Sequence, residues 1–287
     1  MSANHIILRE PYRFFFPVGI MMGWIGVSPW ILYAAHVKDS YSMMFHSSTQ
    51  TMLYVPCFII GFLTTFIPRF TRTEYLSVSE FVSLAGSFLA IAVCVTWEQW
   101  FWAQMIYIML LAFLTGFVLA RLKDFKPSSG GRPPLEMMWI PAGVLIGITG
   151  VVLMIFGQNN IMSALFLKAG KPMMDQGFLL AVTIGVGAFL IPRILGTYRE
   201  YPLRQTPDER KKSLKQDMLF QIICLTAYVL SFWIEGLWGT VGGYGLRATS
   251  VTAVYLRSGT LRWPPGHVPF YGKLAGASAR MFVIGLW

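Results

Sequence analysis

Two histidines at the ends of a short polar segment carry the most distinctive chemistry in this chain. His36 and His46 lie between two apolar runs, and Met52 follows inside the second run. Neutral imidazole binds haem iron or copper, and a thioether sulfur suits Cu(I). These residue types predict a metal site with His36, His46 and Met52 as ligands. The simpler alternative is a loop at the membrane surface, because a chain with 16 methionines contains such clusters by chance.

Glu235 and Arg247 are charged residues in or beside apolar runs near the end of the chain. Charged side chains are costly in lipid, so they are usually paired or functional. We therefore predict an ion pair between Glu235 and Arg247 within the membrane. The alternative is a proton or substrate path, which would need more acidic residues than these runs contain.

The same short pattern ends two of the apolar runs. Residues 61–69 and 185–193 each begin with glycine and end, after six intervening residues, in Pro-Arg. Glycine permits close helix packing, and proline interrupts a helix where neighbours can satisfy the freed backbone groups. Arg69 and Arg193 would then reach the lipid headgroups, or they would act only as determinants of topology. Two copies of the pattern predict an internal repeat.

Composition places the chain in the membrane. Of its 287 residues 55% are hydrophobic and only 13% are charged, and the apolar residues fall in long blocks. Lipid requires every backbone group of such a block to be bonded internally, so the predicted fold is an all-α, polytopic transmembrane helix bundle. Eight runs are long enough to span a bilayer, at residues 14–35, 51–68, 78–96, 101–122, 137–156, 177–194, 219–238 and 241–256.

The basic residues predict the orientation of these spans. They account for the net charge of +10 and gather in alternate loops, around residues 9–13, 69–72, 121–132 and 193–215. The positive-inside rule therefore places the N-terminus of this multi-pass membrane protein in the cytoplasm. The expected partner is the lipid bilayer rather than nucleic acid, because the basic loops flank apolar spans.

The loop at residues 127–136 is rich in proline, glycine and serine, which predicts a cytoplasmic linker between two membrane units. The first unit would cover residues 1–126 and the second residues 137–287. An apolar stretch over residues 273–287 predicts the start of a ninth span, so we expect the second unit to be incomplete at its C-terminus. A short interfacial helix is expected to begin near Pro207.

Several stretches together resemble the NnrS family of bacterial membrane proteins. They are Glu10–Gly19, Gly61–Thr71, Leu76–Glu80, Ile191–Gly196 and Gly245–Arg247. The resemblance implies a polytopic protein associated with haem or copper and with resistance to nitric oxide. Better-known members carry a His-x-His-Glu-Met cluster at the entry to the second helix, where this chain has His46-Ser-Ser-Thr-Gln50. Only the first histidine of the cluster is therefore matched.

Two further functions stay open beside this one. The chain could be a non-catalytic transmembrane subunit that packs against other membrane subunits in a larger complex, or a transporter built from repeats. The sequence has no P-loop, no dinucleotide-binding glycine motif and no HExxH motif. No catalytic residue is therefore predicted, and the sequence leans away from an enzyme.

Overall fold

The computed structural model describes residues 3–125, 134–158, 164–197, 207–263 and 270–287. Within these ranges the chain is helical and contains no strand, which confirms the predicted fold class. The chain divides into two compact units, Met1–Arg132 and Pro133–Trp287. Most of the predicted linker at 127–136 lies outside the described residues.

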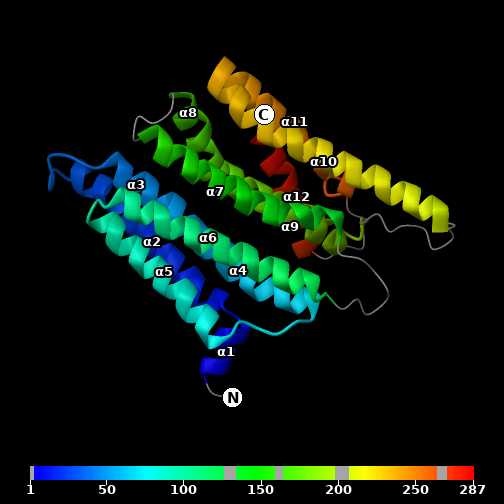
Figure 1. Ribbon diagram of the computed structural model, residues 1–287, viewed down its shortest axis with the longest axis horizontal. Helices are drawn as coiled ribbons and strands as arrows, with labels where there is room; N and C mark the ends of the chain where they lie inside the picture. Colours follow the sequence, from blue (N-terminus) through cyan, green and yellow to red (C-terminus); the bar gives the residue numbers. More distant parts are fainter. Residues whose placement is uncertain (1–2, 126–133, 159–163, 198–206, 264–269) are drawn as a thin grey trace. The chain divides into compact units, whose positions relative to one another are not determined.

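The first unit contains four long helical segments (blue to green in Figure 1). The first segment, Tyr12–Ala34, packs on the second, Met43–Thr71. The third, Val78–Thr96, packs on the fourth, Trp100–Lys123, and the second also contacts the fourth. The second segment is interrupted by a π-helical turn, η1. The elements are α1 (Ala3–Arg9), α2 (Tyr12–Ala34), α3 (Met43–Thr49), η1 (Gln50–Tyr54), α4 (Val55–Thr71), α5 (Val78–Thr96) and α6 (Trp100–Lys123).

The second unit follows the same plan and adds one helix at its end (Figure 1). Its first segment, Leu135–Gln158, packs on its second, Ala164–Leu195. Its third, Pro207–Trp238, packs on its fourth, Thr240–Ser258, and its second contacts its fourth. The elements are the 3₁₀ turn η2 (Leu135–Met138), α7 (Trp139–Gln158), α8 (Ala164–Pro172), the π-helical turn η3 (Met173–Gly177), α9 (Phe178–Leu195), α10 (Pro207–Trp238), α11 (Thr240–Ser258) and α12 (Phe270–Ile284).

Among the described residues, seven helical segments are long and apolar enough to cross a membrane, and they correspond to the first seven predicted spans. The predicted eighth span forms α11, which is not among the seven; its run contains Arg247 and several glycines. The expected short helix near Pro207 is instead the first part of the 32-residue helix α10. No proline or glycine lies between Pro207 and Gly236, so nothing in the sequence ends the helix earlier.

The two units repeat one helix contact at a constant separation of 124 residues. Gly19, Gly23 and Gly26 of α2 have counterparts at positions 143, 147 and 150 of α7, each 124 residues later. A Cβ atom on Gly19 would lie 3.0 Å from the Cβ of Cys57. A Cβ atom on Gly143 would lie 2.7 Å from the Cβ of Ala181, which is the residue that matches Cys57. Small residues therefore allow the same close approach of two helices in both units.

The helix that meets this glycine row also repeats its own features. Both copies contain a π-helical turn in the same place, η1 in the first unit and η3 in the second. Both carry the Pro-Arg pair near their ends, and both end on a residue of left-handed conformation, Arg72 with φ 57° and Gly196 with φ 66°. The internal repeat is therefore visible as repeated local structure within each unit.

Candidate cofactor site and polar clusters

His46 lies on α3 and faces α2. Its Nδ1 is 2.9 Å from the carbonyl oxygen of Gly26, and its ring stacks on Trp30 with centroids 4.5 Å apart. A carbonyl oxygen only accepts hydrogen bonds, so Nδ1 carries the proton and the neutral ring keeps a lone pair on Nε2. Metal-binding histidines are typically oriented by such a bond from the other ring nitrogen. His46 is therefore held in a form that can act as a ligand.

The position of His46 follows from the glycine row of α2. A Cβ atom on Gly23 would lie 2.8 Å from the ring of Tyr54, and one on Gly26 would lie 2.8 Å from Nε2 of Gln50. Without these side chains, α3 and η1 come close enough for Gln50 Nε2 to donate to the carbonyl of Gly23 at 3.2 Å. His46 and Gln50, four residues apart, thus contact the backbone carbonyls of Gly26 and Gly23 from the same side of their helix.

The other two predicted ligands lie elsewhere. His36 is exposed, has a φ of 57°, and follows the end of α2 at Ala34, about 12 Å along the helix axis from Gly26. Met52 is 1% exposed and lies six residues after His46, which places it on a different side of the helix. Among the described residues, no group of three or more His, Cys, Asp or Glu side chains is placed to hold a metal ion.

These positions decide which cofactor the residues fit. A copper site needs several donors that converge on one point, and His36, His46 and Met52 do not converge. An axial haem ligand requires one oriented imidazole, and His46 with its lone pair on Nε2 meets that requirement. The residues present therefore fit a haem better than a copper ion.

The second unit has no equivalent of His46. The residue 124 positions later is Gly170, and α8 packs there directly on the backbone of α7. A Cβ atom on Gly170 would lie 2.9 Å from the carbonyl oxygen of Gly150, which is the counterpart of Gly26. The contact between imidazole and carbonyl in the first unit is therefore replaced by a contact between two glycines.

The second unit carries a buried arginine beside its π-helical turn instead. Arg247 of α11 is 1% exposed, and its Nη2 lies 2.5 Å from Oε2 of Glu235 on α10. Its Nη1 donates to Oε1 of Gln176 in η3 at 2.6 Å, and its Nε donates to the hydroxyl of Ser231 at 3.2 Å. One guanidinium thus links three segments of the unit, and Glu235 and Arg247, both expected from the sequence to pair, are in direct contact.

Two aromatic rings also pack near the guanidinium of Arg247. The guanidinium carbon lies 4.0 Å from the ring centre of Phe232 and 5.0 Å from that of Tyr244, within reach of cation–π attraction. Gly243 allows α11 to approach α10 closely, because a Cβ atom there would lie 2.7 Å from the carbonyl oxygen of Ser231. The guanidinium itself is buried, and its contacts are those of an internal anchor.

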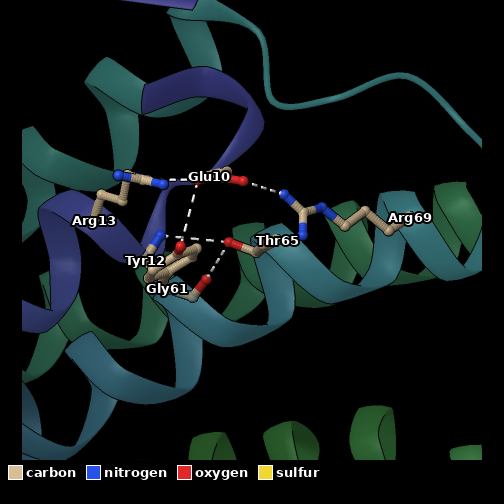
Figure 2. A network of polar contacts seen from close by, with 6 residues as sticks. All are labelled: Glu10, Tyr12, Arg13, Gly61, Thr65 and Arg69. Carbon is tan, nitrogen blue, oxygen red and sulfur yellow. Dashed lines mark hydrogen bonds and ion pairs between the residues drawn. The ribbon is translucent and has the colours of Figure 1, made fainter. Parts of the chain in front are cut away.

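A third polar group lies at the start of α2 (Figure 2). Glu10 accepts from Nε of Arg13 at 2.5 Å and from Nη2 of Arg69 at 2.7 Å. The hydroxyl of Thr65 accepts from the backbone N–H of Tyr12 at 3.3 Å, which satisfies a donor at the beginning of the helix. The network therefore ties the entry of α2 to the last turns of α4.

The charge state of Glu10 follows from these two arginines. The hydrogen bond from Arg13, and then the one from Arg69, lowers the pKa of Glu10 below its ordinary value. A lowered pKa means that the network contributes stability above the ordinary glutamate pKa and loses it as the pH falls through the lowered value. Glu10 is therefore ionised at neutral pH, and the network weakens only in acid.

Arg193, which matches Arg69 in the repeat, has a different arrangement. Its Nη1 donates to the carbonyl of Phe189 on its own helix at 3.0 Å, and its guanidinium lies 3.8 Å from the Phe189 ring. Arg69 instead reaches across to Glu10. The two arginines of the sequence repeat thus make different contacts.

Sequence reasoning missed most of the partners in these clusters. Trp30, Gln176, Ser231 and Thr65 are common in membrane helices, and none of them is charged. Glu10 had one signal, since it begins a stretch that resembles a known family. A glutamine directly before an apolar run, as at Gln176, is one further signal that could have been followed.

The two units repeat one arrangement of apolar helices, in which glycines allow close helix contacts. In the first unit a hydrogen bond orients the imidazole of His46. These features define a polytopic helical membrane protein built on an internal repeat. The NnrS protein family model matches residues 6–273, so the chain belongs to the NnrS family. No curated protein and no solved structure matches the chain.

Proposed function

We propose that this NnrS-family protein lies in the bacterial inner membrane and holds one haem through Nε2 of His46, in a role linked to nitric-oxide stress. The observation that carries the proposal is the hydrogen bond from His46 Nδ1 to the carbonyl of Gly26. This bond sets the tautomer and leaves Nε2 as the ligating atom. The link to nitric oxide rests on the family resemblance. Bound haem iron would supply a coordination site for a small diatomic ligand.

Each neighbouring residue has a role in this proposal. The carbonyl of Gly26 keeps the proton on Nδ1, and the Trp30 ring limits rotation of the imidazole. Gly23 and Gly26 allow α3 to approach α2 closely enough for both contacts to form. The protein therefore positions one ligand with its backbone and one aromatic side chain.

Removing His46 should remove the bound haem. We expect purified wild-type protein to show a Soret absorption band, and His46→Ala to lose it while still inserting in the membrane. His36→Ala is the matched control, because His36 is exposed and lies beyond the end of α2. A Soret band of equal intensity in His46→Ala, or its loss in His36→Ala, would rule out His46 as the ligand.

The alternative function is a non-catalytic subunit that packs against other membrane subunits, and such a subunit would need no ligand set. Wild-type protein without a Soret band or bound copper would favour this alternative. The repeated units suit a transporter as well, because some transporters are built from repeats of the same orientation.

The orientation of the helices can be tested with single cysteines in a variant that lacks Cys57, Cys94 and Cys224. We expect Glu74→Cys and Lys211→Cys to face the cytoplasm, because both positions lie in basic segments. An impermeant thiol reagent added to intact cells should leave both unlabelled and should label Glu98→Cys, which is an exposed position in the opposite loop. Labelling of Lys211→Cys without labelling of Glu98→Cys would reverse the orientation.

A further inference from the structure

One carboxylate binds two half-exposed arginines, one on either side of it, at the entrance of the first unit (Figure 2). Glu10 binds Arg13 through Oε2 and Arg69 through Oε1, and the two arginine side chains are 56% and 48% exposed. We propose that these three residues, the headgroup site, bind the phosphate of an anionic phospholipid. This proposal is independent of a haem at His46.

The donors of the headgroup site suit a phosphate. Glu10 bonds to Nε of Arg13 and to Nη2 of Arg69 (Figure 2). A guanidinium has five N–H donors in a fixed plane, so each arginine keeps further donors beyond the one that Glu10 uses. One guanidinium can bind a phosphate through two parallel N–H···O hydrogen bonds. Here the carboxylate of Glu10 fixes the spacing of two such guanidinium groups.

The location of the headgroup site selects a lipid as the ligand. Glu10 lies two residues before Tyr12, the first residue of a candidate membrane span, and Arg69 lies in the last turn of α4. The site is therefore expected at the level of the lipid headgroups. Arg9 and Arg72 lie nearby in sequence, so residues 9–13 and 69–72 carry four arginines and one glutamate. This positive excess attracts anionic rather than zwitterionic lipid.

The repeat supplies an internal control for the headgroup site. Arg193 ends the same Pro-Arg pattern as Arg69, but it binds the carbonyl and the ring of Phe189 on its own helix. Its guanidinium thus lies against Phe189 of its own helix, whereas Arg69 is bound by Glu10, which also binds Arg13. We assign the headgroup site to Arg69 and not to Arg193, although the sequence pattern alone treats both as candidates for headgroup contact.

Lipid binding can be measured on the full chain in detergent. The thermal unfolding midpoint is followed as phosphatidylglycerol is added, with phosphatidylcholine and inorganic phosphate as comparisons. We expect phosphatidylglycerol alone to raise the midpoint of the wild-type protein. Arg69→Gln should weaken the apparent phosphatidylglycerol affinity about fivefold, as one lost basic residue at a membrane surface predicts. Arg193→Gln should leave the affinity unchanged.

Two variants separate lipid binding from a purely structural role of the same residues. Glu10→Gln removes the carboxylate that spaces the two arginines but keeps both positive charges, so it should lower the starting midpoint and weaken the response to phosphatidylglycerol less than Arg69→Gln does. If Arg69→Gln does not fold, Arg69→Lys replaces it: lysine keeps the positive charge but lacks the planar fork of donors, so the response to phosphatidylglycerol should be weaker than in the wild-type protein. An unchanged response in Arg69→Gln, or equal stabilisation by phosphatidylcholine or inorganic phosphate, would overturn the proposal.

Discussion

Replacing Arg247 by leucine is expected to destabilise the protein by about 3–5 kcal/mol, because removal of one member of a buried ion pair leaves the other charge without compensation. Glu235 would lose its partner at 2.5 Å, and Gln176 and Ser231 would lose the donors that they accept from. The loss would remove the guanidinium that joins Gln176 of η3 to Glu235 and Ser231 of α10. We expect a large drop in the unfolding midpoint and in the yield of monodisperse protein.

Arg257→Ala is the matched control for this variant. Arg257 lies nearer the end of α11 and pairs with Asp217, but its side chain is 41% exposed. Exposed pairs contribute only about 0–1 kcal/mol, so this change should be nearly neutral. The double variant Arg247→Leu with Glu235→Leu should recover much of the lost stability, since apolar replacement of a whole buried pair is often tolerated. Equal effects of Arg247→Leu and Arg257→Ala would contradict the anchoring role.

Charges in apolar runs stand out in a sequence, and for this reason the amino-acid sequence alone predicts the pairing of Glu235 with Arg247. Gln176 and Ser231 carry no charge and follow no pattern, so their part in the same cluster could not be predicted. The helices themselves were easier, because long apolar runs have only one stable backbone arrangement in lipid. The start of α10 was harder to place, because polar residues continue this helix beyond its apolar part.

The candidate ligands show a different limit of sequence reasoning. Residue types suggested that His36, His46 and Met52 could share a metal, but sequence spacing does not define the side of a helix on which each residue lies. The π-helical turn at Gln50–Tyr54 begins shortly before Met52, and the sequence contains no signal for it. The repeated Pro-Arg pattern can be recognised in the sequence. The glycine row of α2 and α7 cannot be interpreted from the sequence alone, because its role depends on which residues of the neighbouring helix it contacts.

The glycine row leads to the second large effect. Gly150→Leu is expected to cost about 3 kcal/mol or more, because overpacking is most costly where the displaced atoms cannot move. A Cβ atom at Gly150 would lie 2.6 Å from the backbone nitrogen of Met174 and 2.8 Å from the carbonyl oxygen of Gly170. Both are backbone atoms, so α7 would have to separate from α8 and η3. The measurement is the unfolding midpoint in detergent.

Two other glycines calibrate the effect of Gly150→Leu. A Cβ atom at Gly19 would meet side-chain atoms only, the Phe58 ring at 2.9 Å and the Cβ of Cys57 at 3.0 Å, and both distances are longer than the two at Gly150, so Gly19→Ala should cost less than Gly150→Ala. Gly86 of α5 has no atom within 4 Å of a Cβ position, and Gly86→Ala should be neutral or slightly stabilising because alanine favours a helix. If Gly150→Ala were as harmless as Gly86→Ala, the helices of the second unit could not be in backbone contact. The contact between Gly150 and Gly170 is what leaves no room for a side chain at position 170, the counterpart of His46. Without that contact, the absence of a histidine at position 170 would need another explanation.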